Sequence, residues 1–240
     1  MKLGDAKPEA DTRVYAIGDV HGCADQLREL ISLIDLDQQT RPSKNHKIIF
    51  LGDYVDRGPA NREVIEYLIE LKNSPRNVEF VLGNHDERIL SFLEDPALVW
   101  DNVMRWGGAR TLEDYGIVPD PSENEEQVSA RFGNAFPDDH FAFLQSLPRF
   151  TSSGDYFFCH AGVRPDVPLS EQTDQDLIWI RYDFLLHEGE FEKVVVHGHT
   201  PGDEPEVKTN RINVDTHCYE SGVLTAVVLE DTNYRFLQTR

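Results

Sequence analysis

The sequence predicts an α/β fold in which short parallel strands alternate with amphipathic helices. Three apolar runs, at residues 14–17, 48–51 and 78–82, each lead into a turn rich in glycine and in aspartate or asparagine. Helically spaced apolar residues follow the first two turns, at Leu27, Leu30, Ile31 and Ile34 and at Val64, Leu68 and Leu71. Strand, polar turn and helix in repeated order are typical of βαβ units with a parallel sheet.

Residues 96–148 interrupt this pattern with a predicted helical insertion. The strand signal fades there, while aromatic and aliphatic residues recur in stretches separated by Gly107-Gly108 and by Pro137. Such an insertion could cap the substrate entrance, or it could form a helical layer packed on the sheet. The sequence leaves both interpretations open.

Strand signals return in the last third of the chain. They occur at residues 156–159, 194–196, 211–214, 223–229 and 234–237. Because these strands follow one another closely, we expect antiparallel pairing in a second, mixed sheet. No shift in composition separates the two halves, so we expect one domain over residues 1–240.

Composition excludes several classes of function. The chain of 240 residues carries a formal net charge of −20, which argues against a nucleic-acid-binding surface. Its apolar runs are far shorter than the roughly twenty residues that span a bilayer, so no membrane association is expected. Its three cysteines, Cys23, Cys159 and Cys218, are typical of reduced thiols. These features predict a soluble, cytoplasmic protein.

Polar residues follow the predicted strands. Asp19 and His21 come two apart after the first strand, so both side chains can lie on one side and bind one cation. Asp53 directly follows the second strand and is the candidate bridging carboxylate. Asn84 follows the third. The carboxyl ends of neighbouring parallel strands converge on one crevice, where we expect these groups to meet.

Histidines after the later strands complete a candidate two-metal site. His160 follows one strand, and either His197 or His199 follows the next. Asp19 and Asp53 would be its only carboxylates, so two divalent cations keep a net charge of about plus two. That excess charge attracts phosphate and acidifies water.

Other residues next to these motifs are suited to catalysis on a phosphate ester. His85 is a candidate general acid, because a protonated imidazole can assist an alkoxide leaving group, and Asp56 could hold its tautomer. Arg57 and Arg181 are candidates for binding phosphate, with Asn84 as a further contact and Arg164 as a weaker third arginine. His46, His140 and His187 are interpreted as surface or structural residues.

Five motifs together resemble the phosphoprotein phosphatase family of metallophosphoesterases, and most closely its small bacterial and phage serine/threonine phosphatases. The motifs are Gly-Asp-Val-His-Gly at 18–22, Gly-Asp-Tyr-Val-Asp-Arg-Gly at 52–58, Gly-Asn-His-Asp at 83–86, His-Ala-Gly at 160–162 and Gly-His-Thr at 198–200. The resemblance implies a central pair of mixed sheets flanked by helices, with two metals, commonly manganese, iron or zinc, at the sheet edge.

The resemblance also implies roles for individual residues. Asp19, His21 and Asp53 would hold the first metal, and Asp53, Asn84, His160 and His199 the second. Asp56 and His85 would form an acid pair, and Arg57 and Arg181 would bind phosphate. A metal-bridging hydroxide would attack phosphorus directly and in line, without a phosphoenzyme.

Three positions depart from the family pattern. Asp86 stands where eukaryotic members have glutamate, and Pro201 stands where the wider superfamily has a second histidine. After Asp215, residues 216–219 read Thr-His-Cys-Tyr in place of a glycine-rich turn. We expect a changed contact at the rim of the site there.

The leading hypothesis from the sequence is a metal-dependent serine/threonine protein phosphatase acting on a phosphoprotein or phosphopeptide. The alternative is a symmetrical diadenosine tetraphosphate hydrolase, for which a residue other than Asp is expected at position 56. A non-catalytic phosphate-binding or scaffold protein is a third hypothesis, disfavoured because all six candidate metal ligands are present.

Overall fold

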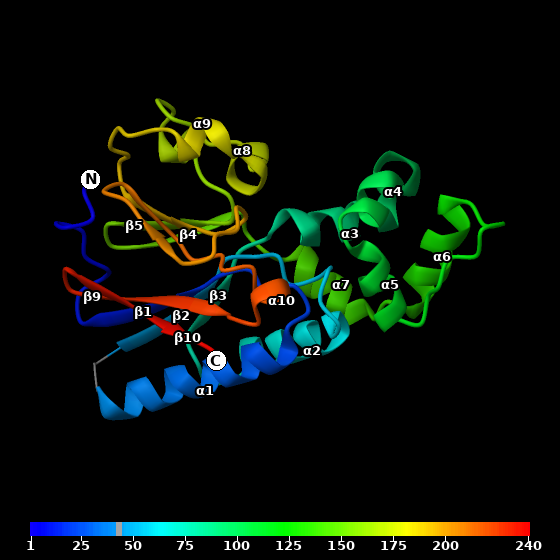
Figure 1. Cartoon of the computed structure of the whole chain (residues 1–240), viewed down its shortest axis with the longest axis horizontal. Helices are drawn as coiled ribbons and strands as arrows, with labels where there is room; N and C mark the ends of the chain where they lie inside the picture. Colours follow the sequence, from blue (N-terminus) through cyan, green and yellow to red (C-terminus); the bar gives the residue numbers. More distant parts are fainter. Residues whose placement is uncertain (42–44) are drawn as a thin grey trace.

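Two five-stranded sheets stack face to face in the computed structural model, which describes residues 1–41 and 45–240 (Figure 1). The first sheet has the strand order β10-β9-β1-β2-β3. Its strands are β1 (Thr12–Ile17), β2 (Asn45–Phe50), β3 (Val78–Phe80), β9 (Thr225–Glu230) and β10 (Asn233–Gln238). β1, β2 and β3 run parallel, whereas β9 is antiparallel to both β1 and β10. The three parallel strands are those predicted from the first half of the sequence.

The second sheet has the strand order β4-β5-β6-β8-β7. Its strands are β4 (Phe150–Ser153), β5 (Tyr156–Cys159), β6 (Val194–His197), β7 (Glu206–Val207) and β8 (Arg211–Asn213). β5, β6 and β8 are parallel, and the antiparallel strands β4 and β7 lie at the two edges. Both sheets are therefore mixed, as expected, but the antiparallel pairing predicted for the late strands was wrong for β5, β6 and β8, which run parallel.

The placement of the last two strands was wrong in the sequence interpretation. Residues 223–229 and 234–237 were expected to pair within the second sheet, but β9 and β10 belong to the first, where Ile17 faces Ala226. β1 carries parallel β2 on one edge, and its other edge needs a hydrogen-bonding partner. β9 supplies that partner, so β1 lies in the centre of its sheet.

Alternation along β1 divides the core into layers. Val14 and Ala16 point toward the second sheet and pack with Phe158 and Val196, whereas Tyr15 and Ile17 belong to the cluster under the helices. This two-residue period is what a strand buried on both faces requires. A third cluster, which includes Phe157 and Val195, covers the outer face of the second sheet.

Helices cover both outer faces. α1 (Ala24–Thr40) and α2 (Asn61–Asn73) lie on the first sheet, and α8 (Asp174–Trp179) and α9 (Tyr182–Leu185) lie on the second (Figure 1). The remaining helices are α3 (Asn84–Glu94), α4 (Pro96–Arg105), α5 (Gly108–Asp114), α6 (Glu125–Ala135), α7 (Asp138–Gln145), the 3-10 helix Leu169–Glu171 and α10 (Cys218–Ser221). No helix among the described residues is long and apolar enough to cross a membrane.

The stretch from residue 96 to 148 is largely helical, and two of its breaks lie where the sequence placed them, whereas a third, at residues 115–124 between α5 and α6, was not predicted. Gly107, with φ of 98°, separates α4 from α5, and Pro137 separates α6 from α7. These helices extend to one side of the two sheets (Figure 1) and share a hydrophobic core with α2 and α3. Phe143 of α7 packs on the rings of Tyr54 and Phe80. The stretch thus forms a lateral layer, of which the loop between α4 and α5 reaches the site described next.

Candidate active site

The strand-end residues from both sheets meet at one edge of the sandwich. Asp19 follows β1, Asp53 follows β2, Asn84 follows β3, His160 follows β5 and His199 follows β6. All of these side chains are buried. The convergence expected for parallel strands is therefore present, and it unites the ends of two sheets in one place.

Two groups of residues have ligand atoms close enough to share a cation. His21, Asp53 and His85 form one group, and Asp53, His160 and His199 form the other, with all ligand atoms of each group within 4.8 Å. Asp53 belongs to both, as a bridging carboxylate must. Its Oδ2 lies 3.4 Å from His21 Nε2, and its Oδ1 lies 3.4 Å from His160 Nε2.

Asn84 and Asp19 adjoin these groups. The Oδ1 atom of Asn84 lies 2.9 Å from His160 Nε2, and His199 Nδ1 lies 3.2 Å from the same nitrogen. The backbone N–H of His199 donates to the Asp19 carboxylate, with nitrogen–oxygen distances of 3.1 and 3.2 Å. All six residues named as candidate metal ligands are brought together by the fold.

Backbone carbonyls fix two of the imidazoles. His21 Nδ1 lies 2.7 Å from the carbonyl oxygen of Val55, and His160 Nδ1 lies 2.8 Å from that of Leu51. A carbonyl can only accept, so Nδ1 is the donor in both rings. The Nε2 atoms consequently face the shared centre, which is the arrangement that outer hydrogen bonds impose on histidine ligands.

The local backbone departs from ordinary conformations at this site. His21, Asp53, Asp56, Arg57 and His199 all have φ between 44° and 73°. Residues other than glycine rarely occupy this left-handed region, and such conformations cluster at functional sites. The turns use it to aim several side chains at one point.

Two glycines allow the motif loops to touch. A Cβ on Gly83 would lie 2.2 Å from the Asp53 carboxylate, and a Cβ on Gly198 would lie 2.0 Å from that of Asp19. Any larger residue would push a candidate ligand out of place.

Burial makes the charged forms of these groups costly. It raises the pKa of Asp19 well above its usual value, with a further contribution from Asp215, and it lowers the pKa of His21 and His199 well below theirs. Burial also opposes the charge on His160, but Asp53 and Asp19 outweigh it and raise the pKa to about 9. Burial works against the charge of Asp53 as well, yet His160 and His85 hold its pKa well below the usual range.

The donor set suits hard or borderline divalent cations. It combines carboxylate and amide oxygens with imidazole nitrogens and contains no thiolate. The buried Nε2 of His199 has no hydrogen-bond partner among the described residues, and a cation nearby would lower the cost of burying Asp19 and Asp53 together. The residues present therefore fit the two metals that the sequence implied.

His85, which belongs to the first of the two groups, also forms a tight pair with Asp56. His85 Nδ1 lies 2.6 Å from Asp56 Oδ2, and the hydroxyl of Thr111 donates to Asp56 Oδ1 at 2.6 Å. The backbone N–H of Asp56 donates back to that hydroxyl at 3.0 Å. With Asp56 accepting at Nδ1, His85 Nε2 is the atom left to exchange a proton, and it lies 4.0 Å from Asp53 Oδ2.

A pocket of about 400 Å³ opens over this centre, lined by arginines and aromatic rings. Its arginines are Arg57, Arg88 and Arg181, and its aromatic residues are Trp106, Trp179 and Tyr219. Arg57 donates to the Tyr219 hydroxyl at 2.8 Å and stacks over that ring at 4.8 Å. Its Nη2 lies 3.2 Å from His85 Nε2. Arg57 and Arg181 thus both reach the pocket, as the sequence suggested.

Several residues at the site were not singled out from the sequence. Arg88, from α3, lies 5.3 Å from the Trp179 ring, and its Nη1 lies 3.9 Å from Asp56 Oδ2. Trp179 donates its Nε1–H to Glu87, which joins α8 to α3. Arg88 comes one helical turn after Asn84, and this spacing could have indicated from the sequence that the two side chains lie on the same face of α3.

Asp86 has a larger role than the sequence indicated. Its carboxylate accepts the backbone N–H groups of Asp53, Tyr54 and Gly83 at 2.8, 2.9 and 3.0 Å. Burial and the nearby Asp53 raise its pKa to about 7. Asp86 therefore joins the second and third motif loops. An acidic residue in the first turn of a helix commonly accepts backbone N–H groups, so this role could have been expected from the position of Asp86 in the sequence.

Other candidates lie outside the centre. His197 packs on Phe184, and Arg164 forms ion pairs with Asp176 and Asp183. In the segment after Asp215, His217 takes a left-handed conformation with φ of 61°, and Tyr219 accepts a hydrogen bond from Arg57.

Comparison with known proteins gives a consistent family. The sequence model of the calcineurin-like phosphoesterase family matches residues 12–229. A bis(5'-nucleosyl)-tetraphosphatase PrpE, designated asymmetrical, from Anoxybacillus flavithermus is 27% identical over 232 residues, which cover 88% of each chain. A protein of the same name from Halalkalibacterium halodurans is 26% identical over 243 residues, covering 93% of each.

Solved structures share the fold. A crystal structure assigned provisionally as a diadenosine tetraphosphatase has a TM-score of 0.66 at 21% identity and covers 97% of this chain and 96% of its own. A cold-active protein tyrosine phosphatase has a TM-score of 0.59 at 16% identity, covering 98% of this chain and 82% of its own. Proteins named for different substrates thus share this architecture, so substrate has to be argued from the pocket.

Proposed function

The chain belongs to the calcineurin-like phosphoesterase family, and from that premise we propose that it hydrolyses dinucleoside polyphosphates with two divalent cations. The pocket is the observation that carries this proposal. Three arginines and three aromatic side chains line it, which is more than one phosphate monoester needs. Arginines bind several phosphates, and flat rings stack on nucleobases. The names of the relatives point to the same substrate class.

The two cations would share Asp53. Asp19 and His21 would complete one set of ligands, and Asn84, His160 and His199 the other. Manganese fits this mixture of oxygen and imidazole donors, as iron and zinc also do. When bound, the cations would neutralise phosphate charge and make a water molecule more acidic.

Arg57 and His85 have separate roles at the phosphate that is cleaved: Arg57 binds it, and His85 donates a proton to the leaving group. Arg57 is held by Tyr219 and donates from Nη2 to His85 Nε2 at 3.2 Å, so a phosphate bound by Arg57 would lie beside that nitrogen. Nε2 accepts in this arrangement, and it can carry a proton of its own once Arg57 turns to the phosphate. His85 then gives its proton to the departing oxygen, while Asp56 and Thr111 hold the ring in one tautomer. Arg88 and Arg181 are placed to contact the rest of the phosphate chain.

A protein phosphatase acting on phosphoserine or phosphothreonine is the second candidate. The observation in its favour is the short Asp56–His85 contact of 2.6 Å. A serine or threonine leaving group departs as an alkoxide and needs a proton donor, whereas a nucleotide leaving group is better and needs the donor less. The pair would therefore be most useful to a phosphomonoesterase.

Side-by-side turnover distinguishes the two candidates. Chelator-treated protein is reloaded with Mn²⁺ and given diadenosine tetraphosphate or a phosphoserine peptide at equal concentrations. We expect a higher kcat/KM on the dinucleotide, and separation of the products shows whether the chain is cut centrally or off-centre. A strong preference for the peptide would overturn the first candidate in favour of the second. No turnover of either substrate would overturn both.

Asp56→Asn provides an internal check on the same assay. The variant should lower peptide turnover by about a hundredfold or more and dinucleotide turnover by less, because the leaving groups differ. Equal losses on both substrates would show that Asp56 does not act through the leaving group.

A further inference from the structure

A second hollow adjoins the pocket of the candidate active site. It has a volume of about 330 Å³, and its wall includes Trp179 and Arg181, which also line the active-site pocket. Each hollow is within the size range of small-molecule sites, which begins at roughly 300 Å³. Two adjacent spaces with a shared wall suit a substrate with two similar halves.

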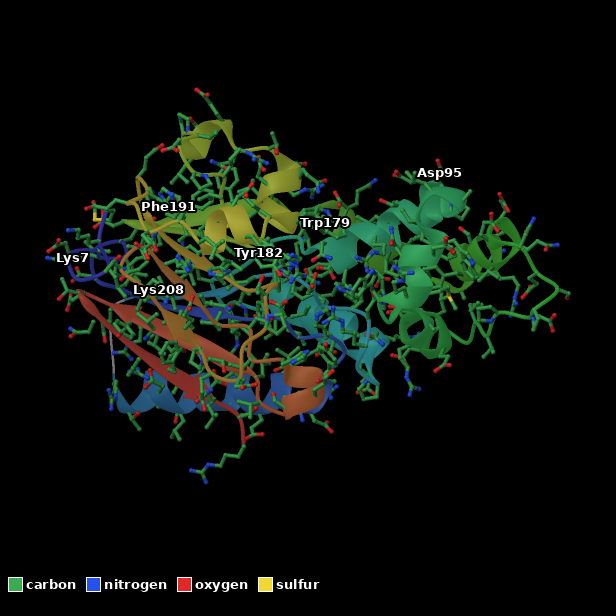
Figure 2. The ribbon with its side chains drawn as sticks, turned by 45° about the horizontal axis from the view of Figure 1, so that its top comes forward. Lys7, Asp95, Trp179, Tyr182, Phe191 and Lys208 are labelled. Carbon is green, nitrogen blue, oxygen red and sulfur yellow. The ribbon has the colours of Figure 1, made fainter. Side chains whose placement is uncertain are left out.

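The second hollow presents an uncovered aromatic ring. Tyr182 lies on its wall and is 75% exposed, although it is separated from the buried Phe184 of the same helix by only one residue. Figure 2 shows Trp179 and Tyr182 on the segment that carries α8 and α9. An exposed tyrosine offers a flat face for stacking with little loss of conformational freedom.

Arginines continue from one hollow into the other. Arg88 and Arg57 belong to the first, Arg181 to both, and Arg164 to the second. Arg164 is half-exposed and pairs with Asp176 and Asp183, so its charge is already balanced there. Arg181 forms no ion pair within residues 1–41 and 45–240. A polyphosphate approaching a protein of net charge −20 needs such local positive charge.

We propose that the second hollow receives the distal nucleoside of a dinucleoside polyphosphate, which stacks on Tyr182 while Arg181 contacts the phosphate chain between the hollows. This inference rests on the proposed function and specifies where the half of the substrate remote from the cleaved bond is bound. It makes Tyr182 a specificity-determining residue that selects substrates with two nucleosides over simple phosphate esters.

Tyr182→Ala tests the inference in the Mn²⁺-loaded full chain. The KM for diadenosine tetraphosphate should rise about tenfold with little change in kcat, since the ring contacts a part of the substrate that does not react. Turnover of p-nitrophenyl phosphate, which has no nucleoside, should stay at the wild-type value. Tyr182→Phe keeps the ring and should behave as wild type on both substrates.

Tyr234→Ala is the matched control. Tyr234 is 43% exposed and lines a different hollow together with Lys208. Figure 2 shows Lys208 at a distance from Trp179 and Tyr182. It should leave both substrates unaffected.

Failure of the inference and failure of the proposed function give different results. If wild type cleaves p-nitrophenyl phosphate but not diadenosine tetraphosphate, the proposed function is wrong, and the inference with it. If wild type cleaves the dinucleotide and Tyr182→Ala has an unchanged KM, the inference alone is overturned. An equal loss in Tyr182→Phe would exclude stacking as the cause.

Discussion

Two buried charged clusters lie at opposite ends of β1, and they are balanced in different ways. At its amino end, Asp37 accepts hydrogen bonds from Arg13, Arg235 and Tyr15 at 3.2, 2.6 and 2.8 Å. Arg13 in turn holds Glu230 through two bonds of 2.8 and 3.0 Å. Beyond the carboxyl end, no lysine or arginine within residues 1–41 and 45–240 forms an ion pair with Asp19 or Asp53.

Asp37 and Asp19 differ in the direction of their pKa shifts, while Asp53, beside Asp19, keeps a lowered pKa through His160 and His85. Burial opposes the charge of Asp37, but its bonds to Arg235 and Tyr15 lower its pKa. Burial and Asp215 raise the pKa of Asp19. The first cluster is balanced by arginines and stabilises the fold, whereas the second has only histidines to balance Asp53 and would be completed by the cations proposed above.

The largest expected effect comes from removing the shared carboxylate. Asp53→Asn should lower hydrolysis of any phosphoester by about a thousandfold or more, because both proposed cations lose a ligand. Metal content should fall from two equivalents to one or fewer. The measurement combines steady-state kinetics with elemental analysis of the purified protein. Wild-type metal content in this variant would show that Asp53 does not bridge.

His85→Asn should preserve metal binding and remove the proton donor. We expect turnover of a phosphoserine peptide to fall by about a hundredfold to ten-thousandfold, and that of diadenosine tetraphosphate by less. Elemental analysis supplies the control, since two metals should remain. Loss of metal along with activity would instead identify His85 as a ligand, consistent with its place beside Asp53 in one group.

Asp37→Asn tests the balanced cluster. It leaves Arg13 and Arg235 without their carboxylate partner and should reduce the free energy of unfolding by about 3 kcal/mol, with metal content unchanged. Asp25→Asn is the control on the same helix, because the Asp25 side chain is 97% exposed. Asp25→Asn should lower the free energy of unfolding by less than about 1 kcal/mol. Urea unfolding at neutral pH measures both variants.

The pH dependence of stability should follow the same residue. Because the folded-state pKa of Asp37 is lower than its unfolded value, its stabilising contribution is full above the unfolded pKa of about 4. That contribution is lost as the pH falls through the folded value. The difference in unfolding free energy between wild type and Asp37→Asn should therefore shrink below about pH 4. A constant difference down to strongly acidic pH would contradict the ion-pair assignment.

The smallest expected effect is the thermal shift on metal removal. Through each of the two sites, Mn²⁺ at a hundred times its Kd should stabilise the chelated protein by about 2.7 kcal/mol, or roughly 5 to 10 °C in Tm. Asp53→Asn should lose most of this shift, and Asp37→Asn should keep it. An equal shift in all three proteins would place the Mn²⁺ elsewhere.

Local signals explain how much of the fold and site could be predicted. Asp19, Asp53 and Asn84 each end an apolar strand, and the structure brings them together where the strand rule places them. The breaks at Gly107 and Pro137 were also correct, since both residues act on their own backbone. The pairing of β9 with β1 depends on the edge of β1 that β2 leaves without a hydrogen-bonding partner. No local sequence pattern indicates which strand will occupy that edge.

Long-range contacts account for what was missed. Thr111 binds Asp56 across 55 residues, and Arg235 binds Asp37 across 198. In neither pair does the sequence around one residue indicate that the other will be its partner. Arg88 is on α3 and Trp179 is on α8, and the two side chains meet only because the fold brings these distant helices together. Their shared place in the pocket could therefore not be predicted from local sequence.

Calorimetric titration of the chelated full chain with Mn²⁺ tests the contrast between the two clusters most directly. The account predicts two cations bound by wild type and by Asp37→Asn, and one or none by Asp53→Asn. Absence of binding to wild type, or two cations still bound by Asp53→Asn, would contradict the assignment of the buried carboxylates beyond β1 to a shared metal centre.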